Sequence, residues 1–274
     1  LTPDTLNLGD PTVVEDINFG RYFALIIGNQ DYNFLDDLRS PLRDAERLQQ
    51  VLETKYGFTT QLVSNASEKE LLMAINNLFG ELTDKDNLLI FYAGHGELSR
   101  AGLSRKERGY WLPVDAQASS ISHWINNAVI SDHLDRLRAR SVLVISDSCF
   151  AGYLGAESSP YLFGLSDVRT TNSMIHAAIN RRSRVVISSG GTRPVLDGNA
   201  QDHSVFAGAL IEALEKNAGP LRDSQLCSQL SVNVAKRAGS LAHTQKPEMK
   251  PVREAGHEGG AFYFVPKPEH IAAK

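Results

Sequence analysis

Short apolar runs alternate along the chain with longer segments of helical periodicity. The predicted strands are residues 22–28, 59–64, 87–93, 141–147, 184–189 and 261–265, and the predicted helices are residues 41–54, 68–81, 132–139, 172–180, 204–215 and 223–238. Near-continuous apolar character in the first, third and fourth strands is typical of central strands covered on both faces. The alternation predicts an α/β fold built on a mostly parallel sheet.

Two long polar segments interrupt this pattern. Residues 97–109 are basic, residues 152–171 contain several Gly, Ser and Pro, and neither segment has clean periodicity. Loops of this length are usually functional or mobile. With 274 residues, 42% of them hydrophobic and 22% charged, the chain can bury a sizeable core. Since the sequence has no internal repeat and no second core, we expect one domain.

Charge and cysteine content narrow the class of protein. The net charge of −4 argues against nucleic acid as a partner, since phosphate binding needs a basic face. No apolar run reaches the ~18 residues of a membrane span, and residues 1–20 lack the pattern of a signal peptide. The two cysteines, Cys149 and Cys227, have different contexts, which fits a reducing compartment and predicts a cytoplasmic protein. Because the chain begins with Leu, we expect an excised domain or processed fragment, with targeting signals or regulatory domains outside it.

Two of the predicted strands end in reactive groups. The strand at 87–93 runs into Gly94-His95-Gly96, and the strand at 141–147 runs into Ser148-Cys149. In a parallel sheet the carboxyl ends of neighbouring strands meet at one edge, where ligands bind. A thiol needs an imidazole there, because the thiolate is the nucleophile and a free thiol titrates at about 8.5. We expect the flanking glycines to let a substrate backbone approach His95. Taken singly, the thiol could be a small buried hydrophobe and the imidazole a turn residue; both in equivalent positions favour catalysis.

Several longer stretches carry a family resemblance. YFALIIGNQDY, LLIFYAGHG, VISDSCFAG and SSGGTRPVLDG, followed by HSVFAGAL, occur in this order and resemble the caspase-like peptidases, especially prokaryotic orthocaspases, paracaspases and metacaspases. The resemblance covers residues 21–266 and includes a GHEGG segment at 256–260. Its candidate base and nucleophile, His95 and Cys149, are 54 residues apart (149 − 95 = 54), close to the separation of about 50 in caspases.

The resemblance implies a fold and a mechanism. The fold is the caspase fold, a largely parallel six-stranded sheet between helices. The reaction is peptide-bond hydrolysis through a thioester acyl-enzyme, with Cys149 as nucleophile, His95 as base, and the backbone N–H groups of Gly96 and Cys149 as oxyanion donors. The resemblance also divides the chain into an N-terminal extension (1–20), a large-subunit-like part (21–151), a linker (152–171), a small-subunit-like part (172–266) and a C-terminal tail (267–274).

Acidic residues predict the specificity. True caspases carry Gln-Ala-Cys at the nucleophile, whereas this chain has Asp147 two positions before Cys149. Residues two apart on an extended segment project to the same side, so Asp147 should share the cleft with the thiol. Paracaspases and metacaspases are similar here, which implies that Asp147 binds a P1 Arg or Lys, with Asp44 and Asp197 as further acids of the S1 pocket. Each acid has an ordinary alternative: Asp147 as a helix cap, Asp44 as a partner of a helix dipole, and Asp197 as a turn residue.

Other notable residues have structural interpretations. The spacing of Cys227 on its helix predicts a buried core thiol, and His203 is expected at the start of an apolar helix. If the chain processes itself, as caspases do, Arg169 is the preferred site, because Arg181 and Arg182 are expected to close a helix.

We therefore expect a cysteine endopeptidase that cleaves protein or peptide substrates after basic residues, Arg in preference to Lys. The alternative is a catalytically silent caspase-like module that binds proteins. The sequence indicates no cofactor: its histidines lack metal-ligand spacing and no loop resembles an EF-hand. Calcium dependence stays open, because metacaspase calcium sites are scattered carboxylates. A homodimer through the last strand also stays open, since caspases and paracaspases pair in this way and metacaspases tend to be monomers.

Overall fold

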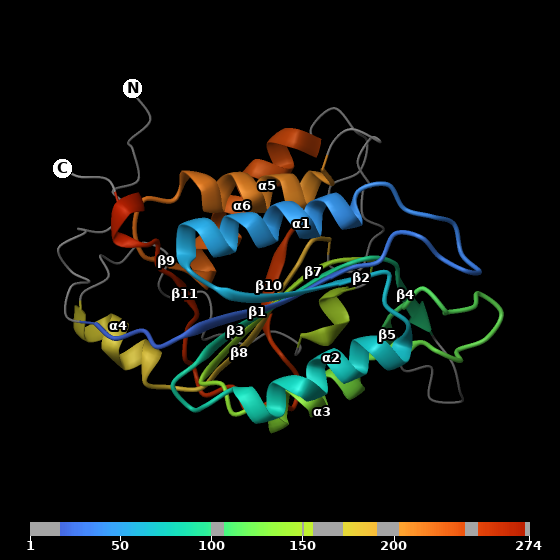
Figure 1. The fold of residues 1–274 in the computed structure, drawn as a ribbon, viewed down its shortest axis with the longest axis horizontal. Coiled ribbons are helices and arrows are strands. Elements are labelled where there is room, and N and C mark those ends of the chain that lie inside the picture. The colour runs from blue at the N-terminus through green and yellow to red at the C-terminus, as the bar shows by residue number, and fades with distance from the viewer. Residues whose placement is uncertain are drawn as a thin grey trace.

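A six-stranded sheet runs through the middle of the molecule (Figure 1). The structure is a computed structural model, and it describes residues 17–99, 107–149, 151–155, 172–190, 203–238 and 246–271. The strands lie in the order β10-β8-β7-β3-β1-β2, with bounds β1 (Tyr22–Gly28), β2 (Thr59–Ser64), β3 (Asn87–Ala93), β7 (Ser141–Asp147), β8 (Ser183–Ser188) and β10 (Glu248–Pro251). All neighbouring strands are parallel except β10, which is antiparallel to β8.

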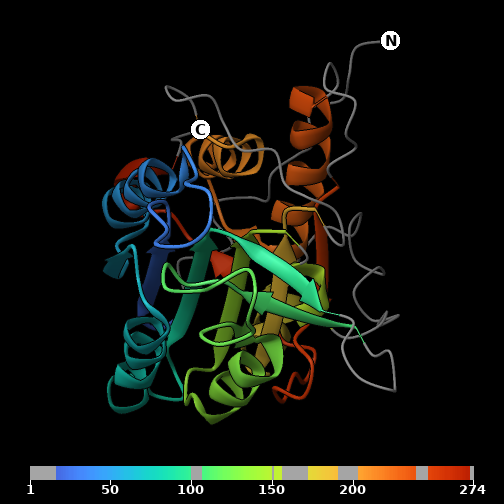
Figure 2. The same cartoon turned by 90° about the vertical axis from the view of Figure 1, so that its right-hand side faces the viewer.

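Helices cover both faces of this sheet. One face carries α1 (Pro41–Val51), α5 (Val205–Lys216) and α6 (Asp223–Ala238), and the other carries α2 (Glu68–Glu81) and α3 (Asn127–Arg136), as Figures 1 and 2 show. Strand periodicity explains the two layers: along β3, Leu89 and Phe91 join the first hydrophobic cluster, while Leu88 and Ile90 join the second. The central strands are buried on both sides, as their apolar sequences predict.

The remaining elements lie around this core. A π-helical turn (Leu52–Tyr56) extends α1, and α4 (Asn172–Ile179) packs on a small cluster that contains Ile17 and Phe19. A three-stranded sheet, β4 (Gly96–Ser99), β5 (Arg108–Trp111) and β6 (Ile125–Asn126), lies beyond the carboxyl end of β3, at the right of Figure 1. No helix in the described ranges is long and apolar enough to cross a membrane.

The topology confirms the expected α/β architecture, a largely parallel six-stranded sheet between helices, and corrects one strand. The sixth strand of the sheet is β10, not the predicted strand at 261–265. Within that apolar segment, β11 (Tyr263–Phe264) pairs instead with β9 (Leu221–Arg222) in a separate two-stranded sheet. Its apolar side chains are buried in an aromatic cluster, where Phe58 stacks on Phe264. β10 escaped prediction because an edge strand with little burial need not be apolar.

Two other boundaries differ from the sequence prediction. The helix predicted at 132–139 begins at Asn127, because the Asn126 side chain caps it by accepting from the Ala128 N–H at 2.8 Å. The ends of the predicted loop at 97–109 pair with each other in the β4–β5 hairpin, while its centre lies outside the described residues.

Candidate active site

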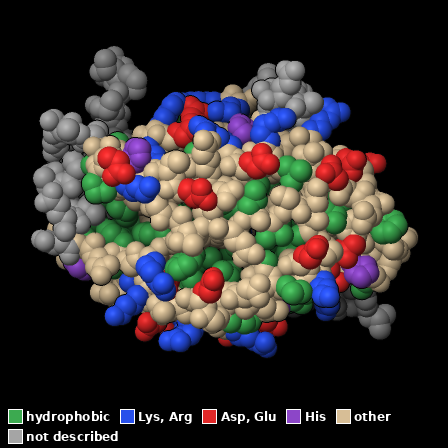
Figure 3. All heavy atoms as spheres, viewed as in Figure 1, with side chains coloured by type: hydrophobic (Ala, Val, Ile, Leu, Met, Phe, Trp, Pro, Cys, Tyr) green, Lys and Arg blue, Asp and Glu red, His purple; other side chains and the backbone are tan. Residues whose placement is uncertain are grey.

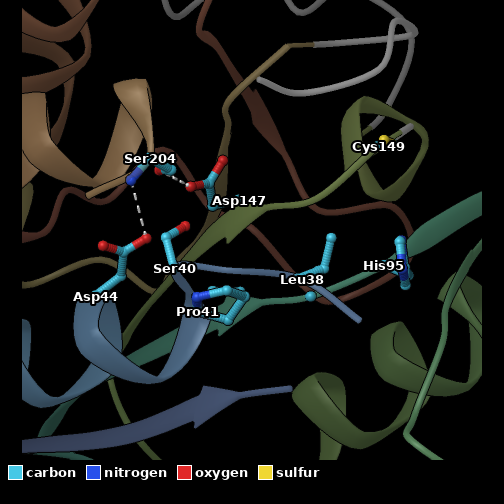
Figure 4. Close-up of a pocket in the computed structure, with 10 residues that line it drawn as sticks. Leu38, Ser40, Pro41, Asp44, His95, Asp147, Cys149 and Ser204 are labelled. Carbon is cyan, nitrogen blue, oxygen red and sulfur yellow. Dashed lines mark hydrogen bonds between the residues drawn. The ribbon is translucent and has the colours of Figure 1, made fainter. Parts of the chain in front are cut away.

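One pocket lies at the carboxyl ends of β3 and β7. It is lined by Leu38, Ser40, Pro41, Asp44, Ala93, Gly94, His95, Asp147, Cys149 and Ser204. These strands are neighbours, with Ala93 opposite Asp147 in the register. The imidazole that follows β3 and the thiol that follows β7 therefore face one pocket, as the strand-end argument predicts. In Figure 4 His95 and Cys149 lie on one side of this pocket, and the two carboxylates lie on the other.

His95 is held at its backbone and at its ring. Its N–H donates to the Tyr32 hydroxyl at 2.8 Å, and the two rings pack with centroids 4.7 Å apart. The ring Nε2 lies 2.8 Å from the backbone carbonyl oxygen of Asp36. Because a carbonyl oxygen can only accept, Nε2 carries the proton and Nδ1 keeps a lone pair. This contact orients the imidazole so that Nδ1 is its basic atom.

Close contacts within the chain itself require the glycines beside His95, and their expected role in substrate approach stays a prediction. A Cβ at Gly94 would lie 2.8 Å from the Tyr32 hydroxyl oxygen, and a Cβ at Gly96 would lie 2.2 Å from the Cys149 carbonyl oxygen. Both contacts are shorter than a side chain tolerates. The first glycine lets the Tyr32 loop close on His95, and the second brings β4 against the nucleophile segment.

The direction of the Gly96 N–H follows from the β4–β5 ladder. Leu112 N–H donates to the His95 carbonyl at 3.0 Å, so the Gly96–Trp111 position in the register is a non-hydrogen-bonded pair. The Gly96 N–H is therefore directed away from β5. Gly96 also lies close to the Cys149 backbone, and the oxyanion role of its N–H stays a prediction. A 3₁₀ turn (Ala151–Leu154) follows the nucleophile segment.

Asp147 is the last residue of β7 and is only 6% exposed. Its Oδ2 accepts a hydrogen bond from the Ser204 hydroxyl. The same hydroxyl oxygen accepts from the Ala207 N–H at 2.9 Å, which makes Ser204 the N-cap of α5. Asp147 thus supports the residue that caps α5, and it shares the pocket with Cys149.

Asp44 approaches the same place from the first turn of α1 and is 1% exposed. Its Oδ1 lies 2.6 Å from His203 Nδ1, and its Oδ2 accepts from the Ser204 backbone N–H at 3.3 Å. Burial raises the pKa of Asp44, and the His203 and Ser204 hydrogen bonds oppose this increase. Ser204 therefore connects the two acids, its hydroxyl to Asp147 and its amide to Asp44 (Figure 4).

Of the other predicted residues, Arg181 and Arg182 are not among those that line this pocket. Asp197 and Arg169 lie outside the described residues, as does most of the predicted linker. Arg181 and Arg182 follow α4, in the turn that enters β8. This position agrees with their expected role at the end of a helix.

Sequence reasoning missed four residues of this site: Tyr32, Asp36, His203 and Ser204. The Asp36 contact uses a backbone carbonyl, which has no sequence signature. Ser204 before an apolar helix is an ordinary cap signal, and the cap could have been predicted from it, but its link to the two acids could not. Among the described residues, no group of three or more His, Cys, Asp or Glu is arranged to hold a metal ion.

Comparisons with known proteins agree with this architecture. The family model described as "Caspase domain" matches residues 21–253. Caspase-1 from Spodoptera frugiperda is similar in structure, with a TM-score of 0.57 and 18% identity over 85% of this chain and 87% of that chain. A structural-genomics target protein from Geobacter sulfurreducens has a TM-score of 0.55 and 16% identity, over 94% of this chain and 98% of that chain. The search of curated proteins found no match. At these identities the two structures show a shared fold.

Proposed function

This chain belongs to the caspase-domain family, and we propose that it is a cysteine endopeptidase that cleaves after basic residues, Arg in preference to Lys. One observation carries the proposal. A thiol, an imidazole and two buried carboxylates line the same pocket, which is partly open to solvent. The first two groups supply nucleophilic catalysis, and the carboxylates supply a reason to prefer a cationic side chain.

The proposed reaction begins with transfer of the Cys149 proton to Nδ1 of His95. The thiolate attacks the carbonyl carbon of the scissile bond, and the N–H groups of Gly96 and Cys149 stabilise the charge on the carbonyl oxygen. His95 then protonates the leaving amine, and a thioester remains on Cys149. Water, deprotonated by His95, hydrolyses the thioester and restores the thiol. The Asp36 carbonyl supports this cycle by keeping the proton of the neutral ring on Nε2.

The proposed specificity follows from charge. Two buried carboxylates in one pocket repel each other, and a P1 cation relieves this repulsion. A guanidinium can donate to two carboxylates at once, whereas an ammonium is a single point charge, so Arg should be preferred to Lys. An acidic P1 residue would add a third negative charge and should be rejected.

Surface charge supports a protein or peptide substrate over a nucleic acid. Basic and acidic side chains are interspersed on the face shown in Figure 3, and the net charge is −4. Phosphate binding needs a continuous basic surface. The homodimer through the last strand stays a prediction. The edge of the central sheet beside β8 is formed by β10, because the predicted last strand at 261–265 lies outside this sheet.

The test uses fluorogenic peptides that differ only in P1 (Arg, Lys or Asp) and a chloromethylketone with P1 Arg. We expect cleavage after Arg, weaker cleavage after Lys and none after Asp, with the reagent attached to Cys149. Cys227→Ala is the matched control: burial raises the pKa of the Cys227 thiol to about 12, so it stays protonated and unlabelled. Cys149→Ala should abolish turnover. A folded protein that neither cleaves these peptides nor reacts at Cys149 would instead be the silent binding module.

A further inference from the structure

His203 has no role in the proposed chemistry, yet its imidazole forms a hydrogen bond with one of the two pocket acids. Its Nδ1 lies 2.6 Å from Asp44 Oδ1, and its side chain is 30% exposed. An ionised carboxylate only accepts, so Nδ1 carries a proton in both the neutral and the charged imidazole. The second proton, on Nε2, can leave without breaking the bond to Asp44. His203 can therefore change its charge while its contact with the pocket is kept.

Groups of both signs surround this imidazole. Asp44 faces it from α1, and Asp147 lies beyond the neighbouring Ser204, at the end of β7. From α6, Arg237 reaches the same site: a Cβ at Gly208 would lie 2.8 Å from Arg237 Nη1 and 3.3 Å from His203 Cβ. Arg237 is itself paired with Glu212 of α5, and the positive end of the α5 dipole lies at Ser204.

We propose that His203 is a specificity-determining residue of the S1 pocket. When a positively charged P1 side chain binds, His203 releases its second proton to solvent, so that the P1 charge replaces the charge of the imidazolium. This inference rests on the proposed function, because it requires a basic residue to enter the pocket. With His203 neutral, the two acids present two negative charges to the substrate; with His203 protonated, one of these is already balanced.

The coupling between proton and substrate is a consequence of like charges. A P1 guanidinium that reaches Asp44 lies beside His203, and two adjacent cations disfavour each other. Binding of P1 Arg therefore favours the neutral imidazole. By linkage, protonation of His203 weakens the binding of P1 Arg by the same factor. A neutral P1 side chain has no such coupling, so the pocket should select for positive charge more strongly as the pH rises.

The experiment measures binding without catalysis. Cys149→Ala protein is titrated with two peptide amides that differ only at P1, Arg or its neutral isostere citrulline, at about pH 5.5 and about pH 8, either side of the usual histidine range. Calorimetry gives the affinity, and repeats in two buffers of different ionisation heat give the protons released. We expect the Arg peptide to bind about tenfold more tightly at the higher pH, within the usual range of coupling. Binding of the Arg peptide should also release protons at pH values between these two. Binding of the citrulline peptide should neither depend on pH nor release protons.

His203→Gln in the same Cys149→Ala protein is the matched variant, because Gln donates a hydrogen bond but does not titrate. It should remove the pH dependence and the proton release for the Arg peptide. If this variant does not fold, His203→Asn replaces it, because the Asn amide nitrogen can take the place of Nδ1 and does not titrate. Tighter binding of Arg than citrulline with no pH dependence and no proton release would overturn this inference and leave the proposed function standing. Arg binding no tighter than citrulline at either pH would overturn both.

Discussion

Residue 147 lies where a strand ends and a nucleophile segment begins, and its position explains both its burial and its proposed role. As the last residue of β7 it is held by the sheet, and its carboxylate reaches the pocket that contains Cys149. Nearby, Ser204 and His203 form hydrogen bonds with the acids. A substrate cation at this site would therefore meet carboxylates whose positions are already fixed, which lowers the entropic cost of binding.

Replacing Asp147 tests the pocket directly. Asp147→Ala should cost a P1 Arg substrate about 2–5 kcal/mol of transition-state stabilisation, the usual loss when one partner of a buried charge pair is removed. The measurement is kcat/KM on the P1 Arg peptide. Asp132→Ala, which removes an exposed acid from α3, controls for net charge. Unchanged efficiency in folded Asp147→Ala protein would show that the basic P1 residue binds elsewhere.

At the scale of elements, the site is an assembly of strand ends and helix starts. β3 and β7 present the imidazole and the thiol, α1 presents Asp44, and the start of α5 presents Ser204. Each group is attached to a rigid element within a residue or two. β4 completes the arrangement by lying against the Cys149 carbonyl.

The contact of β4 with the nucleophile segment predicts a large effect from one methyl group. In Gly96→Ala the new Cβ would fall 2.2 Å from the Cys149 carbonyl oxygen, so the nucleophile segment or β4 must shift. We expect kcat/KM to fall by at least about a hundredfold, the effect of small displacements at a reacting centre.

Gly80→Ala is the matched control for this change. A Cβ at Gly80 meets nothing within 4 Å, and the residue lies in α2. Activity should be unchanged. The free energy of unfolding, measured by thermal unfolding, should rise by about 0.5–1 kcal/mol, because Ala has the higher helix propensity. Full activity in Gly96→Ala would contradict the close contact.

At the scale of the whole molecule, the order of the strands determines whether the two fragments would stay together if the chain were cleaved between β7 and β8. β7 precedes and β8 follows residues 156–171, and the two strands pair at six successive positions in the middle of the sheet. The fragments produced by a cut in this segment would therefore share a buried ladder and the hydrophobic clusters on both faces. Cleavage need not separate them.

We predict self-cleavage after Arg169 rather than after Arg181 or Arg182. The Arg182 carbonyl accepts from the Glu258 and Gly260 N–H groups, and Gly260 packs on the Arg181 carbonyl, so these peptide bonds are held in place. Wild-type protein should give two bands on a denaturing gel and elute as one species from a sizing column. Mass spectrometry identifies the site, and Cys149→Ala protein should stay intact. Wild type that stays intact after long incubation, with and without calcium, would end this prediction.

Stability should depend on pH through His257 of the GHEGG segment. Its Nδ1 accepts the Arg184 backbone N–H at 3.0 Å, and burial, together with the Arg184 charge, lowers the pKa of His257. The folded protein therefore binds this proton less readily than the unfolded chain, whose histidine titrates at about 6.5. The contribution of the neutral ring is fully present above that pH and is lost as the pH falls below it.

His257→Asn tests this contribution, because the Asn oxygen can accept the same N–H and does not titrate. The fall in melting temperature between about pH 7.5 and about pH 5.5, a range that spans the unfolded-state value, should be smaller in the variant. Burial raises the pKa of Asp223 to about 6, so protonation of this carboxyl stabilises the folded protein as the pH falls. This contribution is the same in wild type and variant and cancels in the comparison. An equal fall in melting temperature in the wild type and the variant would show that His257 does not contribute to the pH dependence of stability.

The sequence by itself determined the central strands, the order of the helices and the two strand-end groups. Buried parallel strands must be continuously apolar, and parallel neighbours must end at one edge, so His95 and Cys149 could be brought together without coordinates. The flanking glycines were recognised, but their partners were not, because close approach between distant segments leaves no pattern along the chain.

Only the tertiary structure decided which loops and helix ends contact the residues at the strand ends. The Asp36 carbonyl on His95, the contact of His203 with Asp44 and the bridge through Ser204 join residues far apart in sequence, by bonds that any residue of suitable type could make. The sixth strand shows the same limit. An apolar segment at 261–265 had to be buried, but burial alone does not choose between a place in the sheet and an aromatic cluster beside it, and the polar β10 took the edge because an edge strand needs hydrogen bonds more than apolar side chains.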